Sequence, residues 1–157
     1  TYPAGAPPFR FGIAFNKVTN DVAIAEQNNA VVDAYPVTSS GFGTRYSNPV
    51  TAFGGSITGL KFSNDGALIA ASTQAATPIS VYNWGAGFGT KYSGAPTSAA
   101  GTAIDWSSTT ESIVVGNVTT PPYNAVYVWS GGYGSKYSDP ATAPGSVAAV
   151  SFANQSR

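Results

Sequence analysis

Short apolar runs separated by turn residues fill the chain from one end to the other. The runs are rich in Val, Ile, Tyr, Phe and Trp, as in ISVYNW at 79–84 and AVYVW at 125–129. Gly, Asn, Asp, Ser and Pro bound them, and this combination is typical of β-strands. In SNDG at 63–66 the Asp-Gly pair predicts a tight hairpin turn. No segment has the period of an amphipathic helix, so the pattern predicts an all-β protein.

The runs recur at a nearly constant distance. The aromatic residue near the end of each first run returns after 47, 44 and 46 residues, at Phe15, Phe62, Trp106 and Phe152. A second phrase, glycine-aromatic-glycine-hydroxyl-cation-Tyr-Ser, begins at Gly41, Gly87 and Gly132, at intervals of 46 and 45 residues. A catalytic loop is needed once, whereas a phrase that returns at a fixed distance indicates architecture.

Four short strands in every repeat of this length are the signature of a β-propeller blade, because solenoids of the same period are helical. We therefore predict a single β-propeller, or an arc of one, built from four-stranded antiparallel blades of about 45 residues. Three full blades are expected at residues 11–48, 58–93 and 103–138, with partial flanking units at 1–10 and 141–157.

The repeated phrase is predicted to form the outermost strand of each blade. Its glycines permit the reversal out of the third strand, and its Pro ends the exposed edge. Its aromatic residue and its Tyr fill the widening gap between neighbouring blades. Tyr35, Trp84 and Trp129 each end a third strand, so we expect them to occupy equivalent and buried positions.

The cadence of KFSNDGALIA at 61–70 and VYNWGAGFGTKYS at 81–93 resembles the WD-like propeller repeats of phage virion and tail-associated proteins and of phage-derived environmental sequences. The resemblance covers essentially the whole chain. It implies a structural or adhesive role without catalysis, on a virion or at an extracellular surface. The chain lacks the Gly-His and Trp-Asp dipeptides of eukaryotic WD repeats, so the resemblance does not imply their role as signalling scaffolds.

The composition argues against several classes of function. The chain has no Cys and no His, so thiol chemistry and the commonest general base are missing. Its acids are scattered rather than clustered as a metal site requires, and we expect no enzymatic activity, no cofactor and no metal. Seven cations balance seven acids, so no net charge attracts nucleic acid. No apolar run reaches the length of a membrane span.

The repeated phrase places a cation beside a tyrosine in every unit. The pairs are Arg45 with Tyr46, Lys91 with Tyr92, and Lys136 with Tyr137. As ligand-binding residues they would form a lectin-like protein with one shallow site per blade, each tyrosine stacking on a sugar ring. As structural residues, which is the favoured interpretation, the tyrosine packs between blades while the cation covers the edge.

Two acids, Asp33 and Asp105, fall inside apolar strands. They could line a central channel or bind a ligand. We expect instead that backbone groups or neighbouring hydroxyls satisfy them, because buried polar groups are usually hydrogen-bonded.

Three blades are fewer than a closed propeller contains. The flanks add a lone first strand, SVAAVSF at 146–152, which we expect to pair outside the three blades. The chain begins at Thr1 rather than Met, which indicates processing or a piece of a longer chain. An isolated arc would leave apolar faces in water. We therefore expect partners: identical copies that complete the ring, or the rest of a longer propeller, and in addition a glycan or protein receptor.

Overall fold

The structure is a computed structural model. It describes residues 10–26, 30–97, 100–107, 112–118, 121, 123–142 and 144–153. These residues contain twelve β-strands and no helix, which confirms the all-β prediction. No helix among them is long and apolar enough to cross a membrane.

The strands form three separate four-stranded antiparallel sheets, each a meander in which neighbours along the chain pair with one another. Sheet 1 contains β1 (Arg10–Asn16), β2 (Asp21–Glu26), β3 (Val31–Thr38) and β4 (Gly41–Phe42). Sheet 2 contains β5 (Ile57–Phe62), β6 (Leu68–Thr73), β7 (Ile79–Gly85) and β8 (Gly87–Lys91). Sheet 3 contains β9 (Ala103–Trp106), β10 (Ser112–Gly116), β11 (Asn124–Trp129) and β12 (Tyr133–Lys136).

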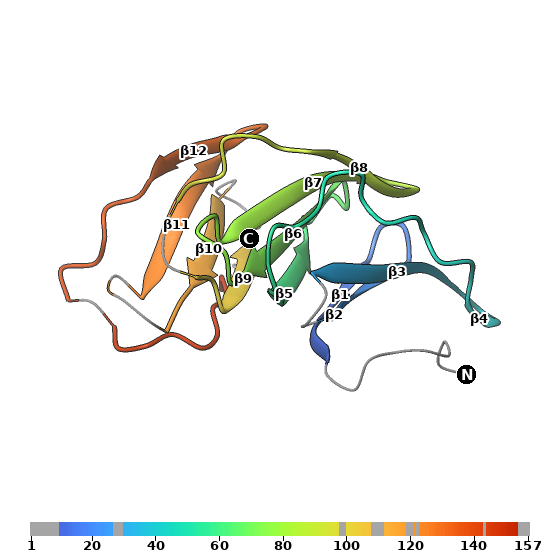
Figure 1. Cartoon of the computed structure of the whole chain (residues 1–157), viewed down its shortest axis with the longest axis horizontal. Coiled ribbons are helices and arrows are strands. Elements are labelled where there is room, and N and C mark those ends of the chain that lie inside the picture. The colour runs from blue at the N-terminus through green and yellow to red at the C-terminus, as the bar shows by residue number, and fades with distance from the viewer. Residues whose placement is uncertain are drawn as a thin grey trace.

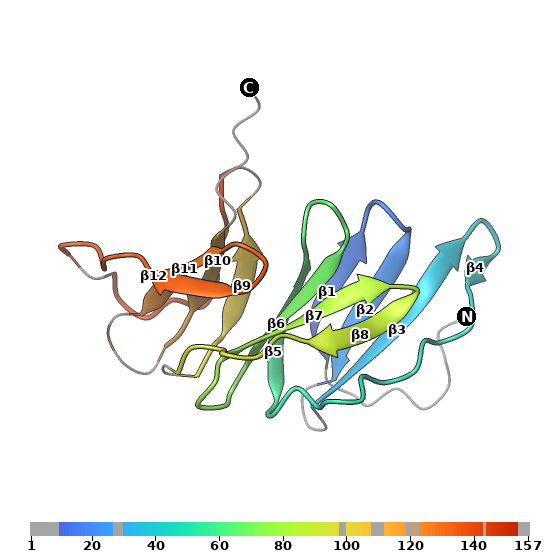
Figure 2. The ribbon, with the colours of Figure 1, turned by 90° about the horizontal axis from the view of Figure 1, so that it is seen from above.

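The three sheets lie side by side in chain order, with sheet 2 between the other two (Figure 1). Their first strands are neighbours, because β1 contacts β5 and β5 contacts β9. The view from above shows sheets 1 and 3 at opposite ends of the row (Figure 2). The repeated four-stranded sheets therefore fit a β-propeller-like repeat, although these three sheets alone do not close a ring.

The pairing register identifies equivalent residues in the three sheets. Across the first three strands the equivalent rows are Phe15–Val22–Tyr35, Phe62–Ile69–Tyr82 and Trp106–Ile113–Tyr127. Tyr35 therefore corresponds to Tyr82, and the expectation that it matches Trp84 and Trp129 is wrong. Both tryptophans lie two residues further along, at the place of Val37. The prediction that Tyr35, Trp84 and Trp129 are buried is confirmed.

The outer strands are shorter than the repeated phrase suggests, and β4 has only two residues. Pro36 of β3 accounts for the short β4. It faces β4, where its carbonyl accepts a bond from Gly43 N–H, but proline has no N–H with which to donate a second bond to that strand. The pairing nevertheless resumes at the tyrosine of each phrase. Its N–H donates to Ala34 in sheet 1, to Val81 in sheet 2 and to Val126 in sheet 3, at 2.8 to 2.9 Å.

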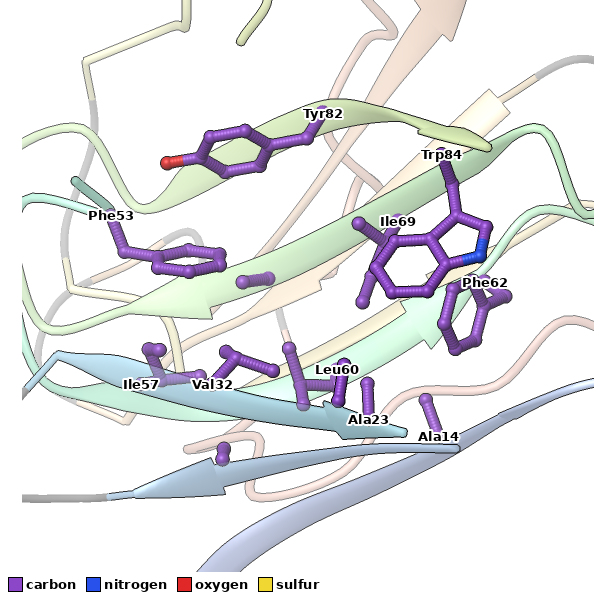
Figure 3. Packing of buried hydrophobic residues seen from close by; sticks show 13 residues of the cluster. Ala14, Ala23, Val32, Phe53, Ile57, Leu60, Phe62, Ile69, Tyr82 and Trp84 are labelled. Carbon is purple, nitrogen blue, oxygen red and sulfur yellow. The ribbon is translucent and has the colours of Figure 1, made fainter. Parts of the chain in front are cut away.

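The first junction, between sheets 1 and 2, packs small side chains against large ones (Figure 3). Ala14 and Ala23 of sheet 1 lie opposite Leu60, Phe62 and Trp84 of sheet 2, and all five are buried. The rings of Phe62 and Trp84 meet edge to face with centroids 5.1 Å apart, a favourable aromatic geometry. Aromatic side chains of the first and third strands of sheet 2 thus fill the gap, and Phe88 of the outer strand β8 packs on Trp84 at 5.0 Å.

The second junction, between sheets 2 and 3, repeats this arrangement. Ala70 and Val81 of sheet 2 pack with Ile113, Trp106 and Trp129 of sheet 3. The two tryptophan rings are 5.2 Å apart and perpendicular. The two junctions therefore share one plan for their apolar contacts.

Residues 146–152 were expected to form a first strand, and the structure contains no strand there. The segment instead lies against sheet 3, where Val147 N–H donates to Asn117 O at 2.9 Å. Gly101, which lies just before β9, makes the equivalent bond: its N–H donates to Thr73 O of sheet 2, also at 2.9 Å. The segment thus follows the path into a further sheet, but it pairs with no further strand among the described residues.

Candidate functional site

The three cations of the repeated phrase have three different partners. Arg45 forms an ion pair with Asp33 at 2.6 Å, Lys91 donates to Ala52 O at 2.8 Å, and Lys136 pairs with Asp139 at 2.6 Å. Lys91 also lies 5.6 Å from the centre of the Tyr82 ring, and burial lowers the pKa of its ammonium group. Each cation therefore binds a different kind of group at the outer edge of its sheet.

The three tyrosines of the phrase also differ in their surroundings. Tyr46 packs edge to face on Trp84 of the next sheet, with centroids 5.5 Å apart, and Tyr92 packs on Trp129 at 4.9 Å. Tyr137 has no following sheet to pack on within the described chain, and it is 49% exposed. The structure thus places the six predicted ligand-binding residues in pairs along the outer edges, without bringing the pairs together. Their role in ligand binding stays a prediction.

At the first junction, a buried carboxylate joins the two sheets. Asp21 begins β2, and its carboxylate accepts hydrogen bonds from Trp84 Nε1 at 2.9 Å and from Tyr46 OH at 2.9 Å. Thr19 Oγ1 donates a third bond. Burial raises the pKa of Tyr46, and the bond to Asp21 and its negative charge raise it further. The hydrogen bonds from the indole N–H and the phenol thereby stabilise a carboxylate that would be costly to bury alone.

Asn16 closes the same junction beside Asp21. Its side-chain nitrogen donates to Gly66 O at 2.9 Å, across the two sheets. Gly66 has a φ of +72°, and a Cβ atom there would lie 2.5 Å from Asn16 Oδ1. Only glycine suits this position, because the turn needs positive φ and Asn16 occupies the space.

The second junction lacks the buried carboxylate of the first, although Asn64 donates to Ser107 O and Lys61 pairs with Asp105 across the two sheets. Leu68 begins β6, as Asp21 begins β2, and its side chain cannot accept a hydrogen bond. Ser63, which follows Phe62 as Asn16 follows Phe15, bonds within its own turn to Asp65 at 2.6 Å. As a result the indole N–H of Trp129, equivalent to that of Trp84, has no hydrogen-bond partner among the described residues.

A cavity of about 670 Å³ lies at this second junction. It is lined by both sheets: Ser63, Asn64, Asp65, Ala67, Leu68, Asn83, Tyr92, Trp106, Ser107, Trp129, Ser130 and Gly131. Asp65 is the charged residue of this lining. Bonds from Ser63 Oγ and from Ala67 N–H lower the pKa of the Asp65 carboxyl, so it is ionised at neutral pH.

Sequence reasoning missed this cavity. It treated Asp65 only as part of the hairpin turn at 63–66. The signal is present in the repeats, because aligning the second strands places Asp21, Leu68 and Ser112 at one position. A leucine at the position of Asp21 predicts that the second junction differs from the first. This prediction is possible only after the structure has shown that Asp21 joins the two sheets.

The two acids inside apolar strands are satisfied by cations. Asp33 pairs with Arg45, and Asp105 pairs with Lys61 at 2.8 Å. The second oxygen of Asp105 accepts a 2.7 Å bond from Phe152 N–H. The backbone bond was expected, whereas the ion pairs were not. No group of three or more acidic side chains that could hold a metal ion occurs among the described residues.

The two end faces of the row of sheets carry residues that the junctions bury. Ile13 and Phe15 of β1 are 70% and 53% exposed. Their equivalents in sheet 2, Leu60 and Phe62, are buried against sheet 1. Tyr137 at the opposite end is exposed, whereas Tyr46 and Tyr92 are partly buried against the next sheet. The face of sheet 1 that carries Ile13 and Phe15 therefore corresponds to the side of sheet 2 that packs on a preceding sheet. The face of sheet 3 that carries Tyr137 corresponds to the side of a sheet that packs on the following one.

Comparison with known proteins supports the fold and no more. No protein-family model matches the chain, and no curated protein matches it in sequence. Among solved structures, hydrazine synthase from Kuenenia stuttgartiensis is similar, with a TM-score of 0.57 and 11% sequence identity over 75% of this chain. The match spans 33% of that structure. This likeness places the chain among all-β proteins built from repeated four-stranded sheets.

Proposed function

We propose that the chain is a non-enzymatic structural module, an arc of a β-propeller that assembles through its two end faces. The observation that carries this proposal is the pair of open faces. Ile13 and Phe15 stand where Leu60 and Phe62 pack on a preceding sheet, and Tyr137 stands where Tyr92 packs on a following one. Exposed apolar patches of this kind mark association surfaces.

The faces differ from each other, so association is head to tail, the heterologous geometry that closes into rings. The partner is a further sheet of the same repeat. Identical copies of this chain supply it most simply, two arcs giving a six-bladed ring, and the remaining blades of a longer chain are the other source. The resemblance to phage repeats favours a virion or extracellular surface as the location, where such a ring serves assembly or attachment.

The proposed non-enzymatic role is supported by the contacts that four acids of the described chain make. Asp21, Asp33, Asp105 and Asp139 each bind a neighbouring donor or cation. Groups that are held in this way stabilise junctions and edges. The alternative function, a lectin-like binder with one shallow site per blade, is less favoured, because the three cation–tyrosine pairs lie in different surroundings.

Light scattering coupled to size-exclusion chromatography tests the assembly. We expect a particle that is a multiple of the 16.0 kDa chain and that dissociates when Phe15 is replaced by Lys. Val50→Lys is the matched control, since Val50 is fully exposed and belongs to the segment that connects β4 to β5 rather than to an end face. A monomer that binds a hydrophobic dye would indicate the longer chain as the source of blades. A monomer that resists dilution and binds no dye would refute the proposal.

A further inference from the structure

The cavity at the second junction offers both donors and acceptors that the protein leaves unused. Trp129 Nε1 has no partner in the described chain. The carboxylate of Asp65 uses one oxygen, Oδ1, for its turn bonds, which leaves Oδ2 as an acceptor. Asn83 accepts a bond from Tyr92 OH through its Oδ1 at 3.0 Å, so its amide N–H groups remain as donors. Asn64 donates to Ser107 O and keeps its own carbonyl oxygen as an acceptor.

These polar groups surround an apolar wall. Leu68 and Tyr92 are half-buried and line the cavity together with Trp106 and Trp129. The volume, about 670 Å³, lies within the range of small-molecule sites, which combine apolar walls with a few convergent polar groups.

We propose that this cavity binds a neutral saccharide. A hydroxyl group both donates and accepts, so neighbouring sugar hydroxyls can satisfy the Asp65 carboxylate and the Trp129 and Asn83 N–H groups at once. An ammonium ion only donates, and it would leave those N–H groups unpaired. An anion only accepts, and it would meet the charge of Asp65. The C–H face of a sugar ring matches Leu68 and Tyr92.

The first junction differs at the same position, and its own pocket, of about 470 Å³, lies along the outer strands beside Arg45, Tyr46 and Phe88. There Asp21 occupies the place of Leu68 and takes the indole N–H of Trp84, and Asn16 bridges the two sheets. At the second junction Leu68 offers no such acceptor to Trp129, although Asn64 bridges the two sheets there by donating to Ser107 O. All cavity residues belong to one chain, so the proposal does not depend on ring closure.

Ligand-detected NMR and tryptophan fluorescence test the site. The probes are glucose, galactose, mannose, fucose and N-acetylglucosamine, with choline and phosphate as the cationic and anionic comparisons. We expect at least one sugar to bind with one site per chain and a dissociation constant of about 1 mM or lower. Choline and phosphate should neither bind in the cavity nor displace that sugar.

Three variants locate the binding. Trp129→Phe removes the indole donor and keeps a ring, and Asp65→Asn keeps the turn acceptor and removes the charge, so each should weaken binding about tenfold. Leu68→Asp installs the closing carboxylate of the first junction and should abolish binding. Trp84→Phe, the same substitution at the other junction, should leave the affinity unchanged.

Far-UV circular dichroism establishes whether each variant is folded. If Leu68→Asp does not fold, Trp129→Phe and Asp65→Asn test the proposal without it. The proposal is overturned if no sugar of the panel binds. It is also overturned if Trp129→Phe and Asp65→Asn bind as the parent chain does, or if choline or phosphate takes the site. None of these results depends on whether the chain assembles, which the light-scattering experiment measures separately.

Discussion

Replacing Trp84 by Phe should destabilise the protein more than replacing Trp129 by Phe. The two tryptophans occupy equivalent positions, and each is 6% exposed. Three aromatic rings surround each of them, at 5.0 to 5.5 Å for Trp84 and 4.9 to 5.2 Å for Trp129. The loss of ring volume is therefore the same in both variants and cancels in their difference.

The difference that remains is the hydrogen bond from Trp84 Nε1 to Asp21. Asp21 is 2% exposed, and a bond to a buried charged group contributes about 1.5–3 kcal/mol. Trp129 makes no such bond. Trp84→Phe should thus lower the free energy of unfolding by about 1.5–3 kcal/mol more than Trp129→Phe does. For a chain of this size, that corresponds to a further drop in Tm of about 3–12 °C.

Urea denaturation followed by circular dichroism measures both variants against the parent chain. The double variant Trp84→Phe with Asp21→Asn provides a control, because without the charge the missing donor should matter less. Equal losses in the two single variants would show that the indole–carboxylate bond adds nothing to the first junction. That result would also remove the physical contrast between the closed and the open junction.

Three further predictions concern other contacts. Lys61→Met should cost about 1–3 kcal/mol, because it leaves the buried Asp105 carboxylate without its cation, and Asp105→Asn in the same chain should restore most of the loss in urea denaturation. Gly66→Ala should cost about 1–3 kcal/mol through its positive φ and its collision with Asn16; Gly131→Ala, which has the same φ of +72° and open space, should cost less in a thermal melt. Burial raises the pKa of Tyr82 and Tyr133 well above the usual value, so the folded chain keeps protons that the unfolded chain loses, and stability should fall as pH rises above about 10. Tyr82→Phe should flatten this decline by up to about 1.4 kcal/mol per pH unit, and an unchanged slope in denaturation series from pH 8 to pH 11 would contradict it.

The sequence predicts the architecture because the same pattern of strands and turns occurs in three repeats. Strand composition, turn residues and the constant spacing of Phe15, Phe62 and Trp106 lead directly to four-stranded sheets in a row. The burial of Trp84 and Trp129 also follows, because large rings are needed where neighbouring sheets diverge. These features depend on composition and period, which a single sequence contains.

Features that depend on pairing register are less accessible to sequence reasoning. Tyr35 is the last aromatic residue of its strand, yet the ladder matches it with Tyr82 because β3 continues past Pro36 to Thr38. The same proline shortens β4 by withholding an N–H from its neighbour. Residues 146–152 have strand composition, but a strand needs a paired neighbour, and the described chain supplies none.

The three sheets can be regarded as versions of one structure with different residues at the same positions. Where the second strand begins, sheet 1 has Asp21, and its junction is closed by a hydrogen-bonded carboxylate. Sheet 2 has Leu68 there, and a cavity lies at the corresponding place beside Trp129. At this position the two junctions, whose apolar contacts share one plan, differ by the exchange of a hydrogen-bonding side chain for an apolar one. The proposed saccharide site would thus be a binding site gained by substitution at one junction, while the other copies of the unit keep the architecture unchanged.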